Sequence, residues 1–502
     1  MTVVVPCSFG SNVVGKQNSA EWVRTVFHDA ITHDKATGLG GLDASIMFET
    51  HREENTGDAF NNTMSEAHEF VSPSASGADM LALGLVASVA ACGGPRIPLR
   101  TGRIDATEAG PPGVPKPDHT LESTIDTFAR AGFDKSDMIA LVACGHTLGG
   151  VHSINFPDIT GGESSPSNKK SFDQSPGSFN PDVAVEYLDG DGANPLVFGH
   201  NDTTNSDKRI FASDGNSTIT KMRDPEAFSA LCGDVFERLL NTVPSTVELS
   251  EPIVLVDVKP YVTRYEVISA ENTTSIAFEG RVRVRTSSDT GYNDETLAVF
   301  LDLKPRKGGN QRVEALRARF RGGQSFGFYN EVFTWYEFAT ELDVAAGLQS
   351  FDIHLVEDAD GNGTKVFDNA GTGGYSVNDG LLFQQTESCL DTTAYDSTGN
   401  FTLKVQAVVR KDLLGDSNAA PVLQYAHRIS QQGAVFPRIS IEVREMELQS
   451  SGNSPYSTFS ASIPVNPAAG SSTFEIELTA GGQVLRSGFQ RTNQLTSGDC
   501  RA

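Results

Sequence analysis

The chain has 502 residues, of which 38% are hydrophobic, and carries a formal net charge of −25 with a pI near 4.8. This length and apolar content predict two or three globular units with buried cores. The acidic balance argues against nucleic acid or an anionic membrane as a partner. The longest apolar run, residues 80–92, is too short and too rich in Ala and Gly to span a bilayer.

Cysteines and glycosylation motifs indicate a secreted protein. The first ten residues lack a basic region followed by a long apolar stretch, so we expect a signal peptide to be absent or already removed. Six cysteines and several Asn-x-Ser/Thr motifs favour an oxidising, glycosylating route of export. These motifs begin at Asn61, Asn201, Asn216, Asn272, Asn362 and Asn400.

The periodicity of apolar residues changes near residue 245. Residues 1–245 show helical spacing, whereas residues 246–502 alternate between apolar and polar positions in short runs bounded by Gly, Asn, Asp and Ser. We therefore predict a mainly α domain followed by an all-β, sandwich-like region of one or two domains. Helices are expected at residues 19–32, 78–91, 121–131, 135–153 and 225–241.

The first helix contains the stretch EWVRTVFHDA, residues 21–30. Arg24 and His28 are four residues apart, so both should project from one helix face. Asn18 followed by Glu21 predicts an N-cap with its capping-box partner. An imidazole can move a proton between two peroxide oxygens, and a permanently charged guanidinium can stabilise the departing hydroxide, so this pair suits peroxide chemistry.

A second motif, ACGHTLGGVH, follows an apolar helical run and places His146 at its end. Together with Arg-x-x-Phe-His-Asp at residues 24–29, it resembles the plant, fungal and bacterial haem peroxidase superfamily. The first motif resembles the distal helix of that superfamily and the second its proximal, haem-ligating helix. The resemblance covers the N-terminal half of the chain and implies a haem b enzyme that reduces hydrogen peroxide and oxidises small phenolic or dye-like donors in one-electron steps.

The resemblance assigns roles around the haem. On the distal side Arg24, Phe27 and His28 match the catalytic helix, and Asn55 in ENTG matches the acceptor that orients the distal imidazole. On the proximal side it implies the following residues: His146 as the iron ligand, Asp214 in RIFASDGNS as its hydrogen-bond acceptor, Phe172 as the aromatic beneath the haem, and His152 near a haem propionate.

Two ion sites are also implied by the resemblance. Asp29, Gly41, Asp43 and Ser45 match the distal calcium loop of secreted members, and their hard oxygens suit calcium. A second, proximal site would use Thr147, Asp173, Ser175, the Ser178 carbonyl and Asn180, although Ser175 and Asn180 stand where Thr and Asp are usual. That change favours weaker calcium binding, a monovalent cation or no ion. The segment DADGNG at residues 358–363 lacks the Glu that closes a calcium loop and is expected to be a turn.

The residues that distinguish donors within the superfamily are mostly missing. Of the positions that match a manganese site, Gln17, Glu21 and His152, only Glu21 is acidic. Leu141 stands where lignin peroxidases carry a surface Trp, and Asn155 stands where plant enzymes carry an ascorbate-binding Arg. Generic small donors remain. A peroxide-disproportionating activity is an alternative that Phe27 disfavours, and a purely structural role with a degenerate pocket is a second one.

Cysteine pairing and the role of the β-rich region stay open at this point. By resemblance to secreted fungal members we expect Cys7 to pair with Cys92, and we also expect Cys389 to pair with Cys500, with Cys144 a buried free thiol. The β-rich region could bind carbohydrate or cell wall, act as a spacer, or shield the haem edge. A flat strip formed by Tyr329, Phe333, Trp335 and Tyr336 would favour carbohydrate binding.

Overall fold

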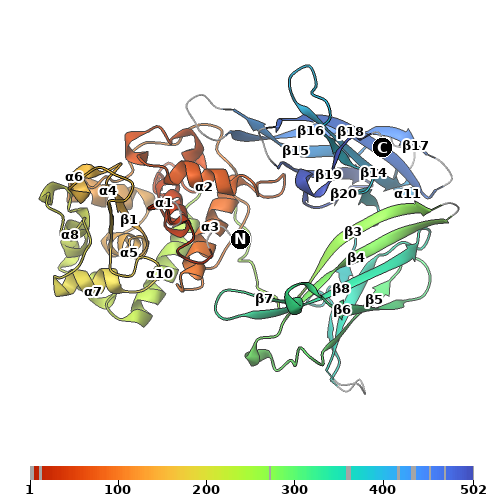
Figure 1. The fold of residues 1–502 in the computed structure, drawn as a ribbon, viewed down its shortest axis with the longest axis horizontal. Helices are drawn as coiled ribbons and strands as arrows, with labels where there is room; N and C mark the ends of the chain where they lie inside the picture. Colours follow the sequence, from red (N-terminus) through yellow and green to blue (C-terminus); the bar gives the residue numbers. More distant parts are fainter. Residues whose placement is uncertain are drawn as a thin grey trace. The chain divides into compact units, whose positions relative to one another are not determined.

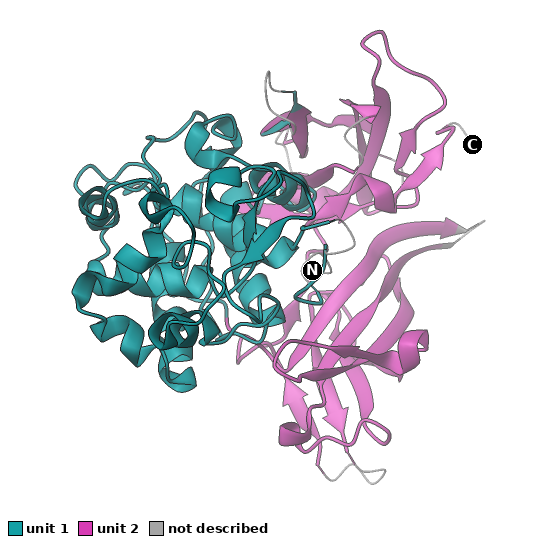
Figure 2. Cartoon of the chain, turned by 60° about the vertical axis from the view of Figure 1, so that its left-hand side comes forward, with its two compact units in different colours: residues 1–253, 429–439 teal, residues 254–428, 440–502 magenta. Residues whose placement is uncertain are grey.

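A computed structural model describes residues 5–10, 14–270, 273–357, 363–414, 419–430, 437–451, 454–467 and 471–500. The chain divides into two compact units, one of residues 1–253 with 429–439 and one of residues 254–428 with 440–502 (Figure 2). The first unit is mainly helical and the second is built of β-strands (Figure 1), which confirms the predicted fold class. In the described part of the chain, every helix is too short or too polar to cross a membrane.

The helical unit contains ten α-helices and four 3₁₀ turns within its described residues. Four of the five predicted helices are confirmed to within two residues at either end. The α-helices are α1 (Asn18–Ala30), α2 (Ala59–Ala67), α3 (Gly77–Ala91), α4 (Leu121–Ala131), α5 (Lys135–Gly145), α6 (Pro157–Thr160), α7 (Asp182–Asp189), α8 (Ser206–Phe211), α9 (Ser217–Lys221) and α10 (Pro225–Leu240). The 3₁₀ turns are η1 (Ser45–Phe48), η2 (Glu53–Asn55), η3 (Asp202–Thr204) and η4 (Ala212–Asp214).

The close packing of α1 against α3 fixes the helix that carries Arg24 and His28. Trp22 is fully buried, and a Cβ placed on Gly84 would lie 1.8 Å from Cε3 of its indole ring. Only glycine therefore allows α3 to approach this ring so closely. The indole Nε1 donates to Oε2 of Glu66 at 2.9 Å, which satisfies the one polar atom of this buried side chain.

The predicted capping box at the start of α1 is wrong. The helix already includes Asn18, and its N-cap residue, Gln17, makes no side-chain cap bond. Asn18 Nδ2 instead donates to Glu66 at 2.6 Å, and Glu21 accepts a hydrogen bond from Asn62 of α2 at 3.0 Å. Residues of α2 bind the two side chains that a local cap would have used.

Helix α5 is shorter than predicted, because it ends at Gly145 rather than at residue 153. His146 is its C-cap residue, and Gly149 has a φ of +82°, a conformation that favours glycine and turns the chain away from the helix. The following residues form β1 (Gly150–His152), which pairs antiparallel with β2 (Lys169–Ser171). The helix end thus presents His146 at a break between two elements.

Three disulfide bonds cross-link the chain. Cys7–Cys92 and Cys389–Cys500 are bonded as predicted. The prediction that Cys144 is a free thiol is wrong, because it bonds Cys232, with a Cα–Cα separation of 5.6 Å. Both residues of this bond are fully buried where α10 packs on α5, so a contact between helices distant in sequence joins them.

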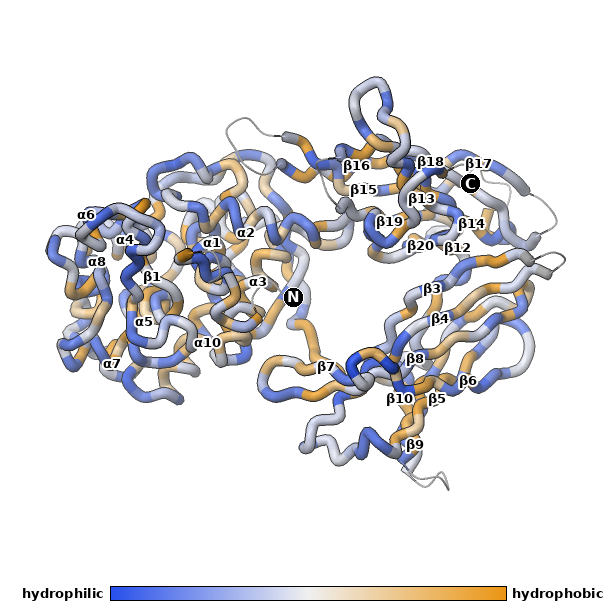
Figure 3. Tube along the Cα trace, viewed as in Figure 1, coloured by the Kyte–Doolittle hydropathy of each residue, from blue (hydrophilic) through white to orange (hydrophobic). Residues whose placement is uncertain are grey.

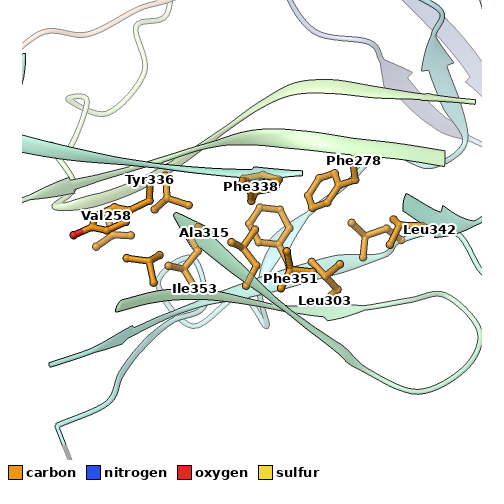
Figure 4. Packing of buried hydrophobic residues seen from close by; sticks show 14 of the residues in the cluster. Val258, Phe278, Leu303, Ala315, Tyr336, Phe338, Leu342, Phe351 and Ile353 are labelled. Carbon is orange, nitrogen blue, oxygen red and sulfur yellow. The ribbon is translucent and has the colours of Figure 1, made fainter. Parts of the chain in front are cut away.

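A nine-stranded sheet forms the first part of the β unit. Residues of β4 and β8 face residues of β5 and β9 across one core, in which Phe278, Phe338 and Phe351 are in contact (Figure 4). Alternate residues of β5 are buried, as the period-two pattern predicts. The strands are β3 (Val258–Ala270), β4 (Thr273–Arg285), β5 (Ala298–Lys304), β6 (Gln311–Arg317), β7 (Gln324–Phe326), β8 (Val332–Asp343), β9 (Ser350–Val356), β10 (Lys365–Phe367) and β11 (Tyr375–Ser376), with main order β10-β9-β5-β6-β8-β4-β3.

Two further sheets form the second part of this unit and share a separate core. Val405 and Phe459 of one sheet pack with Leu423 and Ile476 of the other, the arrangement of a β-sandwich. Hydrophobic and hydrophilic residues alternate along these strands (Figure 3). The strands are β12 (Leu381–Phe383), β13 (Cys389–Asp391), β14 (Phe401–Arg410), β15 (Val422–Ile429), β16 (Arg438–Glu445), β17 (Glu447–Ser450), β18 (Tyr456–Val465), β19 (Thr473–Ala480), β20 (Gln483–Arg486), β21 (Gln490–Arg491) and β22 (Thr496–Gly498).

Charged side chains join the two cores of the β unit. Asp379, which lies between β11 and β12, accepts from Arg306 at 2.7 Å and from Arg410 at 2.5 Å. Glu266 of β3 is 1% exposed and accepts from the backbone and hydroxyl of Thr386. These bonds connect the nine-stranded sheet to the sandwich that follows it. The segment 358–362, which includes most of the predicted turn in DADGNG, lies outside the described residues.

Candidate active site

The distal histidine lies on α1 with its tautomer set by two hydrogen bonds in series. Asn55 of η2 is fully buried, and its Nδ2 donates to the Glu49 carbonyl at 3.0 Å. Its Oδ1 must therefore be the atom that lies 2.8 Å from His28 Nδ1, so this ring nitrogen donates. The other nitrogen, Nε2, is left without a proton and can act as a base.

Burial keeps this imidazole neutral. Desolvation, followed by the neighbouring Arg24 charge, lowers the pKa of His28 to about 3. Burial also lowers the pKa of Arg24 to about 10, which leaves the guanidinium charged at neutral pH. The base and the cation thus coexist in their active forms over the physiological range.

Aromatic rings and a backbone carbonyl hold Arg24 in place. Its Nη2 donates to the Thr56 carbonyl at 2.9 Å, and its Cζ lies 4.6 Å from the centre of the Phe60 ring. The same Phe60 ring lies 4.8 Å from the His28 ring. Phe27, the residue beside His28 in the sequence, is half-buried and packs on Phe128 at 5.8 Å. Arg24, Phe27 and His28 are therefore presented together by one helix.

On the proximal side the partner of His146 is Asp207, not Asp214. His146 Nδ1 lies 2.7 Å from Oδ2 of Asp207, a fully buried carboxylate that also accepts from Asn194 at 3.0 Å. Because a carboxylate only accepts, Nδ1 carries the proton, and Nε2 presents its lone pair. The His146 side chain is 30% exposed, and its ring stacks on Phe172 at 4.2 Å with an interplanar angle of 10°.

Asp214 has a local role instead. Its two carboxylate oxygens accept from the backbone amides of Ser217 and Thr218 at 2.9 and 3.0 Å at the start of α9. The Thr218 hydroxyl also donates to it at 2.6 Å. Asp214 is therefore a helix-capping residue, and the prediction that it orients His146 is wrong. Two aspartates stand seven residues apart in this segment, and only the fold distinguishes them.

The predicted distal calcium residues gather around one buried carboxylate. Asp29 is fully buried, and its oxygens accept from the amides of Asp43, Ala44 and Ile46 at 2.7 to 3.0 Å. Ser45 contributes its hydroxyl at 3.4 Å. Burial, and then the nearby Asp43 charge, raise the pKa of Asp29. Gly41 lies in the same loop with a φ of +112°, where a Cβ would meet the Thr242 carbonyl at 2.6 Å.

The predicted proximal ion residues also come together, and they include an unpaired oxygen. Asp173 is 1% exposed; its Oδ1 accepts from the Ser175 amide, whereas its Oδ2 is buried with no hydrogen-bond partner among the described residues. Burial, with Glu186 and Asp182 adding to it, raises the pKa of Asp173 to about 7. Thr147 exchanges hydrogen bonds with Asn180, which in turn donates to Ser175. Ser178 follows in the same loop, with its amide bonded to the Ser175 carbonyl.

Several functional residues escaped sequence reasoning. Glu49 supplies the carbonyl that fixes Asn55, and Asp182 and Glu186 surround the proximal loop. Within the described residues, the chain forms no cluster of three or more His, Cys, Asp or Glu side chains that could hold a metal by themselves. Any calcium here would therefore rely on hydroxyl and carbonyl oxygens as well as on carboxylates.

Comparisons with known proteins identify sequences to which this chain is similar. The family profile described as Peroxidase matches residues 11–222. A "WSC domain-containing protein" of Arthroderma benhamiae is 35% identical over 499 residues, which cover 98% of this chain and 64% of that protein. "L-ascorbate peroxidase 5, peroxisomal" of Arabidopsis thaliana is 33% identical over 171 residues, 34% of this chain and 57% of that protein. A protein of Pyricularia oryzae provisionally named as a heme-binding peroxidase is 36% identical over 143 residues, 26% of this chain and 46% of that protein.

The chain thus spans less than two thirds of the length of each of these relatives. The similarity to the named peroxidases covers about a third of the chain or less, whereas the Arthroderma protein is similar along nearly all of it. The two histidine arrangements both lie inside the matched segment. Residues 11–222 of this chain are a domain of the peroxidase family, followed by a β-rich region.

Proposed function

We propose that this chain is a haem b peroxidase that reduces hydrogen peroxide and oxidises small phenolic or dye-like donors. The observation that carries the proposal is the pair of oriented imidazoles. In each, Nδ1 donates to a buried acceptor, Asn55 for His28 and Asp207 for His146, which leaves both Nε2 atoms available. A structural protein would have no use for two imidazoles whose Nε2 lone pairs are left free by buried supports.

The proximal residues fit a haem. Imidazole nitrogen is a usual axial ligand of haem iron, and a carboxylate on the other ring nitrogen raises the basicity of the ligand. His146 with Asp207 supplies this arrangement, and Phe172 stacked on His146 restricts the orientation of its ring. When bound, the haem would supply the two electrons that reduce peroxide and would then recover them from donors.

The distal residues would handle the protons. His28 Nε2 would take the proton from one peroxide oxygen and deliver it to the other, so that water leaves when the O–O bond breaks. Arg24 would stabilise the negative charge that develops on the departing oxygen. Asn55 would keep the proton on Nδ1, so that Nε2 stays basic, and Phe27 would limit the space above the site.

Generic small donors suit this chain better than manganese, ascorbate or a bulky lignin-like donor. Gln17 directs its amide to the Pro176 carbonyl, Glu21 accepts from Asn62, and His152 brings no charge of the needed sign, so the three positions offer one carboxylate at most. Leu141 is 2% exposed and cannot relay electrons from the surface. Half-buried Asn155 replaces the Arg expected of ascorbate enzymes.

Replacing His28 tests the distal assignment. We expect His28→Leu to slow the reaction of the haem-loaded protein with peroxide by about 10³-fold, because a positioned general base is lost. With a pKa near 3, the base is already deprotonated above about pH 4, so the parent rate should be flat from pH 5 to 8. Stopped-flow absorbance measures both. A His28→Leu rate equal to that of the parent protein would refute the assignment.

The two aspartates near α8 and α9 offer a matched comparison. Asp207→Asn should weaken the electron-donating character of His146 and shift the Fe(III)/Fe(II) potential of the bound haem upward, because the negative charge at Nδ1 is lost. Asp214→Asn removes only the cap of α9 and should leave the potential unchanged while lowering stability by about 1 kcal/mol. Redox titration with thermal melting distinguishes these effects. Equal potentials in both variants would show that Asp207 does not tune the ligand.

We also propose that calcium binds at the distal loop and, more weakly, at the proximal loop. The support is electrostatic. Burial raises the pKa values of Asp29, Asp43 and Asp173, and nearby carboxylates add to this effect at Asp29 and Asp173, a cost that a cation removes. Chelation should release calcium, which atomic absorption measures. It should also lower the free energy of unfolding by about 3 kcal/mol relative to protein kept at a calcium concentration of about one hundred times Kd. Asp43→Asn should abolish the distal part of this effect. Identical melting with and without chelator would contradict the proposal.

For the β unit we propose contact with a cell-wall carbohydrate. Tyr336 is only 2% exposed and belongs to the core, so it cannot join the predicted strip. Trp335 and Phe333 instead lie on the opposite face with Tyr261, whose ring is 5.5 Å from that of Trp335 and tilted by 39°. Arg283 stacks on Phe333 at 4.5 Å, which adds hydrogen-bond donors to an aromatic surface.

Binding to insoluble chitin and β-glucan tests this surface. We expect the double variant Tyr261→Ala, Trp335→Ala to lose about tenfold in affinity, because two stacking rings are removed. Tyr395→Ala is the control, since Tyr395 is an exposed aromatic in the loop between β13 and β14 that stacks on Phe401. Retained binding in the double variant, or none in the parent, would exclude this role.

The sequons and the three disulfides support export to an oxidising, extracellular compartment.

A further inference from the structure

The outer face of the nine-stranded sheet carries two cations in a row with an aromatic ring. Strand β4 lies between β3 and β8 in this sheet (Figure 1). Lys259 of β3 is register-paired with Arg283 of β4, and Arg283 is register-paired with Trp335 of β8. Their sequence neighbours Val258 and Val282 are buried, so these three side chains point away from the core. Directly opposed side chains of antiparallel strands start about 5 Å apart, which places the two cations and the indole next to one another.

Aromatic rings lie against both cations. Nζ of Lys259 is 5.3 Å from the centre of the Tyr261 ring, and that ring is 5.5 Å from the ring of Trp335. The guanidinium carbon of Arg283 lies 4.5 Å from the centre of the Phe333 ring. Positive charge and stacking surface are therefore available at the same place.

The fold does not neutralise these two cations. Among the described residues, the ammonium group of Lys259 has no hydrogen bond or ion pair, and its polar neighbourhood is the Tyr261 ring. Arg283 donates from Nη2 to the Val256 carbonyl at 2.8 Å, and its Nε is buried without a hydrogen-bond partner in the described part of the chain. A carbonyl satisfies one donor but carries no formal charge, so both positive charges stay unbalanced.

The other arginines of β4 on this face are paired with acids. Arg281 lies 2.9 Å from a Glu337 oxygen, and Arg285 lies 2.6 Å from Asp257 and 2.8 Å from Asp289. These carboxylates are already engaged and do not cover the neighbouring row. The two unpaired cations therefore stand out in a chain whose formal net charge is −25.

We propose that Lys259 and Arg283 make the aromatic surface of the β unit selective for a carboxylated polysaccharide. This selectivity rests on the carbohydrate contact proposed above. A sugar ring would stack on Trp335 and Tyr261. In a uronic acid the carboxylate is bonded directly to the sugar ring, so it would lie close to the stacked ring, where the two cations are. Charge-assisted hydrogen bonds from Arg283 and the point charge of Lys259 would then hold it.

Calorimetry with the full chain tests the selectivity. We expect polygalacturonate to bind the parent protein about tenfold more tightly than the same polymer with its carboxylates methyl-esterified, because only a free carboxylate forms charge-assisted bonds. Polyglutamate, which has carboxylates but no sugar ring, should bind about tenfold more weakly than polygalacturonate, because stacking is lost. Equal affinity for the free and the esterified polymer, or for polyglutamate and polygalacturonate, would overturn the proposal.

A matched pair of double variants locates the site. Lys259→Gln with Arg283→Gln should bind the free and the esterified polymer equally, because the charges are removed while the rings remain. Lys307→Gln with Lys404→Gln removes two charges from exposed side chains elsewhere in the β unit and should keep the parent's preference. Equal melting temperatures would show that both are folded. If the first variant melts lower, Lys259→Gln alone, a change at an exposed side chain, should still reduce the preference. A preference that neither Lys259→Gln nor the double variant reduces overturns the proposal.

The selectivity and the carbohydrate contact can fail separately. If chitin and β-glucan bind through Tyr261 and Trp335 but the carboxylate preference is absent, the contact stands and the selectivity is wrong. If the parent binds polygalacturonate through Lys259 and Arg283 but binds neither neutral glycan, the selectivity is supported and the contact with chitin and β-glucan is wrong. Binding of none of these polymers overturns both.

Discussion

The hydrogen bond between His146 and the buried carboxylate of Asp207 is the interaction on which the proposed chemistry depends. It fixes the proton on Nδ1 and thereby presents the lone pair of Nε2. The fold makes this bond possible by ending α5 at Gly145, so that His146 emerges at a helix terminus, and by bringing α8 beneath it. The disulfide between Cys144 and Cys232 anchors the same helix end to α10.

On the distal side a buried acceptor also fixes the proton of the imidazole on Nδ1, but this acceptor is a neutral amide. The Glu49 carbonyl orients the Asn55 amide, and Asn55 in turn orients the His28 ring. A backbone atom therefore determines that Nε2 of His28 is the basic nitrogen. The packing of Trp22 on Gly84 holds α1 in register with this acceptor. Because each imidazole is oriented by a buried group, the two can face a ligand without rearrangement, which is the preorganisation that a fast peroxide reaction needs.

Local sequence patterns predicted what depends on local order. The spacing of Arg24 and His28 placed both on one helix, and the period-two runs after residue 245 predicted strands. Patterns failed where two candidates were chemically equivalent. Asp207 and Asp214 are both aspartates in a short polar segment, and the structure alone shows that one faces His146 and the other caps α9. Cys144 could not be paired from sequence, because the packing of α10 on α5 that brings Cys232 beside it is a tertiary contact.

The same limit explains the other corrections. The spacing of Asn18 and Glu21 matches a capping box, but in the structure both side chains form hydrogen bonds with residues of α2 instead. Trp335 and Tyr336 are adjacent aromatics that were expected in one strip, yet neighbouring residues of a strand face opposite sides, so one lies in the core and the other outside. Tertiary contacts, which are not visible in a short motif, decided the partners of Asn18 and Glu21. Strand alternation, which the sequence does show, separates Trp335 from Tyr336.

The most direct test of the central claim is replacement of the proximal ligand followed by chemical rescue. His146→Gly should bind haem poorly and react slowly with one equivalent of hydrogen peroxide, as followed by bleaching of the Soret band in stopped flow. Added imidazole should restore both properties, because it would occupy the space left by the missing ring beside Asp207. A His146→Gly protein that binds haem and reacts with peroxide as the parent does, without imidazole, would contradict the account.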